Sequence, residues 1–161
     1  MTRLTLTFLL CLCTLIGAFG QQAIELKDVV GGKFYPRNIA NILPIPGDGE
    51  HYTQMNADHT QVVKYSFKTG QQVEVLFDAT TARECPFKRF ESYSFSPDGS
   101  KLLIATETSY IYRRTYKAEH YLYSLKRNIE GKINNVVERL SEGGPQQAPV
   151  FSPDGNMVAF V

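Results

Sequence analysis

The chain has 161 residues, a formal net charge of +1 and 20% charged residues, a balance typical of a globular protein. Apolar residues make up 43% of the sequence, which is enough to form a hydrophobic core. Nucleic-acid binding requires a clustered basic face, and the balanced charge gives no reason to expect a nucleic-acid partner.

Residues 1–20 are predicted to be a secretory signal peptide. Arg3 supplies the positive start, residues 4–16 are almost unbroken apolar, and small residues occupy positions 18 and 20. The alternatives are a buried helix or a membrane anchor, but an anchor needs about 20 apolar residues and this run is shorter. We therefore expect cleavage after Gly20 and export to the periplasm, the cell exterior or the outer-membrane surface.

Residues 21–40 are predicted to form an N-terminal arm ahead of the first strand. The apolar residues between Ile24 and Val30 mix helical and strand spacing, and Gly31 and Gly32 end the segment. A short helix and a docking arm would both fit this pattern.

A five-residue sequence then occurs twice. Phe-Ser-Pro-Asp-Gly stands at residues 95–99 and again at 151–155, 56 residues later, and a degenerate copy lies at 46–49. Proline presets φ near −65°, aspartate bonds back to its own backbone, and glycine takes the positive φ that closes the turn. A period of about 40 to 60 residues with strand-like runs is typical of β-propeller blades.

Strand signals between these turns complete two blades and open a third. The predicted strands are residues 41–45, 52–56, 62–67 and 72–77 for the first blade, 92–95, 102–106, 120–125 and 136–140 for the second, and 148–151 and 157–161 for the third. We therefore predict an all-β chain in which residues 41–161 form a partial β-propeller. Because a propeller closes only with several blades, we also expect a fragment of a longer protein.

The cysteine, histidine and glycine patterns contain no clear signature of a disulfide, a metal site or a catalytic motif. Only Cys85 follows the signal peptide, so no disulfide can form within the predicted mature segment. Its basic neighbours could lower the thiol pKa, the residue could instead be a small apolar packing group, or its partner could lie beyond residue 161. The three histidines are isolated in the sequence, which contains neither G-x-S-x-G nor a phosphate-binding glycine loop. We therefore predict no metal and no cofactor.

One segment departs from the blade pattern. Residues 107–120 connect the second and third strands of the second blade, where the first blade needs only residues 57–61. The segment is rich in Tyr and Arg, which give rigid contact area and a forked donor suited to carbonyl and carboxylate oxygens. The alternative is an ordinary extended ribbon whose arginines reach into water.

The same segment resembles the dipeptidyl peptidase IV family. Residues 112–125 read YRRTYKAEHYLYSL and are similar to the family pattern W-R-H-S-Y-x-A-x-Y-x-I-Y-x-L. Residues 91–103 resemble the opening of that family's second blade, residues 24–34 its N-terminal arm, and residues 84–87 its bacterial, Bacteroidetes-type members. The Pro-Asp-Gly turns also occur in TolB-type propellers, whereas the Arg-containing segment is more selective.

The resemblance implies an eight-bladed propeller stacked on an α/β-hydrolase domain that carries a Ser-Asp-His triad beyond residue 161. Such enzymes release dipeptides from peptide N-termini and prefer Pro or Ala in the second position; the resemblance leaves a homodimer open. Arg113 corresponds to the arginine that binds the substrate carbonyl and orients an acidic pair, which also lies beyond residue 161. Tyr112 and Arg114 stand where the animal enzymes have Trp and His, and both could support Arg113. The competing class is a non-catalytic TolB-like propeller that binds protein partners, and the sequence beyond residue 161 would distinguish the two.

Overall fold

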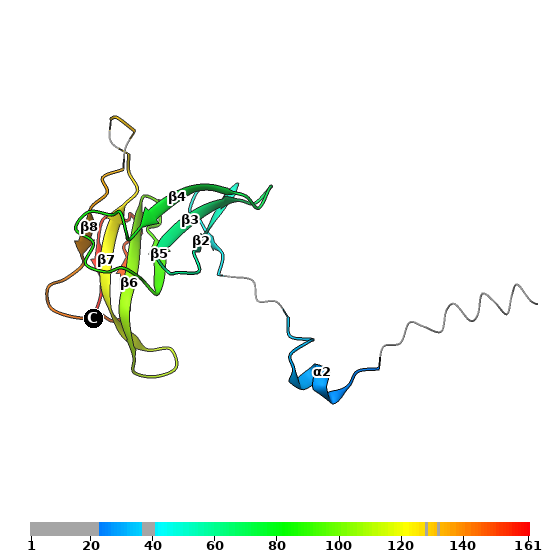
Figure 1. Ribbon diagram of the computed structural model, residues 1–161. Helices are drawn as coiled ribbons and strands as arrows, with labels where there is room; N and C mark the ends of the chain where they lie inside the picture. The colour runs from blue at the N-terminus through cyan, green and yellow to red at the C-terminus, as the bar shows by residue number, and fades with distance from the viewer. Residues whose placement is uncertain (1–22, 37–40, 128, 132) are drawn as a thin grey trace, which may run out of the picture. The chain divides into compact units, whose positions relative to one another are not determined.

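The structure is a computed structural model that describes residues 23–36, 41–127, 129–131 and 133–161 (Figure 1). The predicted signal peptide, residues 1–20, lies outside these described residues. The chain divides into two units at residue 39, and each is treated by itself. Within the described part of the chain, every helix is too short or too polar to cross a membrane.

The first unit contains one short helix, α2 (Leu26–Val30). The Asp28 carboxylate accepts a hydrogen bond of 3.4 Å from the Glu25 backbone N–H, which satisfies one of the free donors at the helix start. None of the helix residues is buried, and the side chains of Leu26 and Val30 are 79% and 75% exposed. The short helix was one of the two predicted forms of this arm.

The second unit consists of antiparallel sheets. The first sheet has the order β1 (Leu43–Pro44), β2 (His51–Met55), β3 (Gln61–Ser66) and β4 (Gln72–Asp78). The second has the order β5 (Ser92–Phe95), β6 (Lys101–Tyr110), β7 (Tyr116–Ser124) and β8 (Val137–Arg139). A two-stranded sheet of β9 (Val150–Phe151) and β10 (Val158–Ala159) follows. The prediction of two four-stranded blades and the start of a third is confirmed.

The strand boundaries differ most in the second blade. The sequence predicted a strand ending at Thr106 and another beginning at His120, whereas β6 continues to Tyr110 and β7 begins at Tyr116. In Figure 1 the resulting hairpin extends beyond the sheets. The predicted strands of the third blade were too long, because β9 and β10 have two residues each.

The hydrophobic core lies between the two four-stranded sheets. The buried side chains that form it come from both sheets and from the segment that connects them: Val62, Leu76, Phe77, Ala79, Phe90, Tyr93, Leu102, Ile104, Tyr121, Tyr123 and Val137. Phe77 of β4 packs edge-on against Tyr123 of β7, with ring centroids 4.8 Å apart. The Tyr93 hydroxyl also donates to Thr53 Oγ1 at 2.8 Å, a buried hydrogen bond between the blades. These contacts fix the second blade against the first.

The repeated Pro-Asp-Gly turns have the conformation that their residues predict. Gly99 has φ of +69°, and its N–H donates to the carbonyl of Ser96 at 2.8 Å. The Asp98 carboxylate accepts from the Ser100 N–H at 3.1 Å, as expected for an aspartate that bonds back to the backbone. Gly155 repeats this arrangement with φ of +68°.

The turns of successive blades also touch each other. A Cβ atom added to Gly99 would lie 3.0 Å from the backbone carbonyl oxygen of Pro46 in the first blade. One added to Gly155 would lie 3.3 Å from Asp98 Oδ1 in the second. Lys101 Nζ donates to the Gly155 carbonyl at 2.6 Å. The glycines are therefore required by the turn conformation and also by the close approach of neighbouring blades.

Candidate functional site

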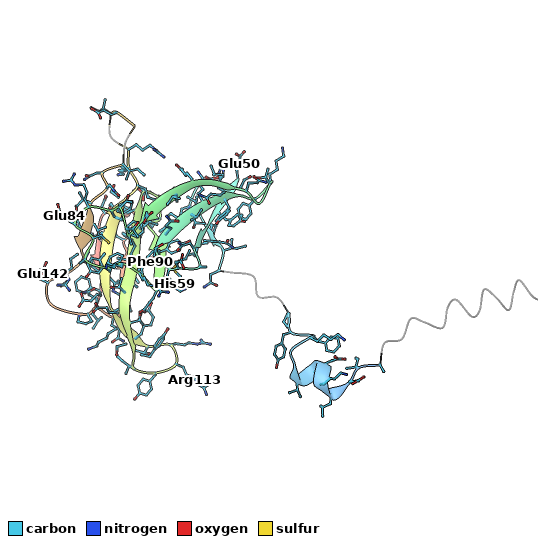
Figure 2. The ribbon with its side chains drawn as sticks, viewed as in Figure 1. Glu50, His59, Glu84, Phe90, Arg113 and Glu142 are labelled. Atoms are coloured by element: carbon cyan, nitrogen blue, oxygen red, sulfur yellow. The ribbon has the colours of Figure 1, made fainter. Side chains whose placement is uncertain are left out.

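The Tyr- and Arg-rich segment forms the end of the β6–β7 hairpin. Tyr110 is paired with Tyr116, and the Ile111 N–H donates to the Thr115 carbonyl at 2.8 Å, which closes the loop. The segment is therefore an extended hairpin, a backbone form that fits both the binding interpretation and the ordinary-ribbon interpretation. Figure 2 shows Arg113 at the far end of the hairpin.

The hairpin loop holds all three residues that the resemblance assigned to the site. Tyr112, Arg113 and Arg114 are consecutive and exposed, with 77% of the Tyr112 side chain accessible. Among the described residues, neither arginine takes part in an ion pair. Two planar forks of N–H donors are thus available to an external carbonyl or carboxylate.

A β-bulge lies at the base of the hairpin on the β6 side. The β6–β7 register shifts between Thr106 and Ser109, so that two residues of β6 stand opposite Ala118 alone. Glu107 has φ of +52°, an unusual conformation for a residue other than glycine. The following N–H, of Thr108, donates to Glu91 Oε2 at 3.1 Å. Nothing in the sequence pattern indicated that Glu107 would lie in a bulge or that Glu91 would bond to this bulge.

Gln146 holds the base of the hairpin on the β7 side. Its backbone N–H and carbonyl bond to Ala118 at 2.8 and 3.0 Å, and its side chain is almost fully buried. Gln146 Oε1 accepts the His120 N–H at 3.0 Å and lies 3.2 Å from His120 Nδ1. Because an amide oxygen is only an acceptor, Nδ1 carries the proton, and burial lowers the pKa of His120. His120 is therefore a neutral, structural histidine.

Cys85 packs against the interblade core. The thiol donates to the Phe87 carbonyl at 3.1 Å, and burial raises its pKa. A raised pKa disfavours the reactive thiolate, so packing fits the described residues better than activation by the basic neighbours, and a partner beyond residue 161 stays a prediction. In the described ranges, Cys85 is a free cysteine, and no cluster of three or more His, Cys, Asp or Glu residues could hold a metal ion.

Comparison with known proteins gives a consistent set of relatives. Residues 96–161 match the family described as dipeptidyl peptidase IV (DPP IV) N-terminal region. The crystal structure of Porphyromonas gingivalis dipeptidyl peptidase 4 is 42% identical, with a TM-score of 0.69 over 88% of this chain and 19% of that chain. Human prolyl endopeptidase FAP is 29% identical over 140 residues, which are 87% of this chain and 17% of the human protein. Dipeptidyl-peptidase 5 of P. gingivalis is 31% identical over 78 residues, 47% of this chain and 11% of that protein. The chain thus spans less than a fifth of the length of each of these relatives.

Proposed function

The chain belongs to the N-terminal region of the dipeptidyl peptidase IV family, and on that basis we propose that it orients substrate in a serine exopeptidase. The intact enzyme releases X-Pro and X-Ala dipeptides from peptide N-termini. Its Ser-Asp-His triad belongs to an α/β-hydrolase domain outside residues 1–161, so these residues alone are inactive. The other parts of the proposal are cleavage after Gly20, export, an arm over residues 21–40 and propeller blades over residues 41–161.

The observation that carries the proposal is the position of Arg113 at the end of the closed hairpin. Its guanidinium has no ion pair within the described residues, so no carboxylate in this part of the chain occupies its donors. A charge-assisted hydrogen bond to the carbonyl of the substrate's second residue would stabilise the complex by about 1.5–3 kcal/mol. Arg113 would also orient the acidic pair that binds the substrate amine, and Tyr112 and Arg114 flank it.

Substitution of Arg113 in the intact enzyme tests this role. We expect Arg113→Ala to reduce kcat/KM for a Gly-Pro substrate by about tenfold to a hundredfold, because both the contact and the substrate orientation are lost. Arg113→Lys should restore activity only in part, since a point charge cannot reproduce the planar fork.

Arg114→Ala is the matched control, because it removes the same exposed guanidinium from the neighbouring position. An equal loss at both positions would mean that the assignment is one residue out of register or that the loop is only structural. An intact protein that cleaves no dipeptide from any peptide would instead favour a TolB-like binding propeller.

A further inference from the structure

We infer that Glu91 is a positioning residue that fixes the direction of the hairpin on which Arg113 is carried. The inference rests on the proposed role of Arg113 and adds a residue that lies outside the hairpin. It starts from the β-bulge in β6, where the regular pairing with β7 stops and then resumes. A bulge bends its strand and increases the local twist, so its geometry sets where the rest of the hairpin points.

Two residues of the bulge, Glu107 and Thr108, stand opposite a single residue of β7, Ala118. Ala118, the residue opposite the bulge, uses both its N–H and its carbonyl to bond with Gln146 on the other side of β7. The Thr108 N–H bonds instead to the Glu91 carboxylate at 3.1 Å. A charged acceptor makes this a stronger hydrogen bond than a neutral group would.

The backbone of Glu91 is anchored beside the interblade core, while its carboxylate is exposed. Its N–H donates to the Ala105 carbonyl at 2.9 Å, which ties its backbone to β6 just before the bulge. The preceding residue, Phe90, is 1% exposed, and its N–H donates to the His59 carbonyl of the first blade at 2.9 Å. The carboxylate therefore connects the Thr108 N–H of the bulge to a backbone segment that is hydrogen-bonded to both blades.

The conformation of Glu107 supports the same conclusion. A non-glycine residue with φ of +52° costs free energy and persists only where the surroundings determine it. The Glu91–Thr108 hydrogen bond acts on the next peptide group and holds the bulge in this form. Beyond Thr108 the hairpin is mostly exposed, so a change of angle at the bulge displaces the loop with little resistance from packing.

The test uses the full-length enzyme with three substitutions. Glu91→Ala removes the acceptor, Glu91→Gln keeps an acceptor without charge, and Glu138→Ala removes an exposed glutamate on β8 as the matched control. We expect Glu91→Ala to lower kcat/KM for a Gly-Pro substrate about three- to tenfold. Glu91→Gln should recover most of this loss, and Glu138→Ala should match the wild type.

Two readouts separate positioning from general stability. In an Arg113→Ala background, Glu91→Ala should change kcat/KM less than about twofold, because the residue acts through Arg113. Hydrogen exchange of the Thr108, Ile111 and Tyr112 amides should accelerate in Glu91→Ala, while exchange in the β5–β6 pairing stays unchanged. Equal losses in both backgrounds, or unchanged exchange at these amides, would overturn the inference.

The outcomes also distinguish this inference from the proposed function. Wild-type kcat/KM in Arg113→Ala would refute the proposed function. Wild-type kcat/KM in Glu91→Ala, together with the expected loss in Arg113→Ala, would refute the positioning role of Glu91 alone.

Discussion

Substituting Gly99 by alanine tests whether the turns of neighbouring blades are packed as the structure places them. An L-residue at φ of +69° costs about 1–2 kcal/mol relative to glycine. The new Cβ would also lie 3.0 Å from the Pro46 carbonyl oxygen, a backbone atom that can move only with its whole turn. Overpacking of this kind adds roughly 1–3 kcal/mol. We therefore expect Gly99→Ala to lower the free energy of unfolding of the propeller by about 2–5 kcal/mol.

Gly70→Ala is the matched control for the backbone contribution. Gly70 has nearly the same φ, +67°, but nothing lies within 4 Å of its added Cβ, so only the conformational cost of about 1–2 kcal/mol applies. Gly155→Ala should fall between the two, because its nearest neighbour is a side-chain oxygen of Asp98 at 3.3 Å. Urea unfolding of the full-length variants measures their free energies of unfolding and so tests this ranking. Equal destabilisation by Gly99→Ala and Gly70→Ala would refute the interblade contact.

Three further predictions concern pH, export and association. Hydrogen bonding from the Glu50 N–H, with His51 and Lys64 nearby, lowers the pKa of Asp48 to about 2, so its stabilisation is present above about pH 4 and is lost as the pH falls toward 2. Because solvent screens this partly exposed carboxylate, Asp48→Asn should reduce the loss of unfolding free energy across this pH window by only about 1 kcal/mol, and an unchanged pH dependence would contradict this. Mass spectrometry of the exported protein should find Gln21 at its N-terminus, whereas an intact Met1 in a membrane fraction would exclude cleavage. Residues 21–161 alone should associate in size-exclusion chromatography, because the apolar side chains of Val150, Met157 and Phe160 are 62%, 69% and 42% exposed. A monodisperse monomer with a cooperative melt would contradict this prediction.

The blade architecture could be predicted because its signals are local. The strand predicted over residues 92–95 has the bounds of β5, since alternating side chains lead directly into a Pro-Asp-Gly turn. The glycine of the turn over residues 68–71 has the positive φ that the turn requires. The degenerate turn differs in one respect: Gly47, with φ of +77°, takes the position that Asp98 holds in the second blade. Asp48 Oδ1 instead accepts hydrogen bonds from the N–H groups of Glu50 and His51, at 2.9 and 3.1 Å.

The hairpin and its supports could not be predicted to the same extent. A bulge shifts the alternation of side chains by one residue. The sequence pattern therefore predicted a strand end at Thr106, although β6 continues to Tyr110. The αL conformation of Glu107 has no sequence signal of its own, because glycine is the residue expected there. Glu91 and Thr108 are 17 residues apart, and only the strand register brings them together.

The hairpin base is held by hydrogen bonds while the Arg113 side chain is exposed, and this affects the entropy cost of substrate binding in the proposed role. An arginine side chain loses about 2 kcal/mol of rotamer entropy when it is immobilised, and each backbone residue that must be ordered adds about 1–2 kcal/mol. In this hairpin hydrogen bonds hold the backbone at the tip, between Ile111 and Thr115, and at the base, to Glu91 and Gln146. Substrate binding then has to order the Arg113 side chain but not the loop that carries it. Because the gain from one charge-assisted hydrogen bond is about 1.5–3 kcal/mol, ordering even one backbone residue as well would cancel it. The stability of the hairpin base thus decides whether Arg113 can contribute to substrate binding at all.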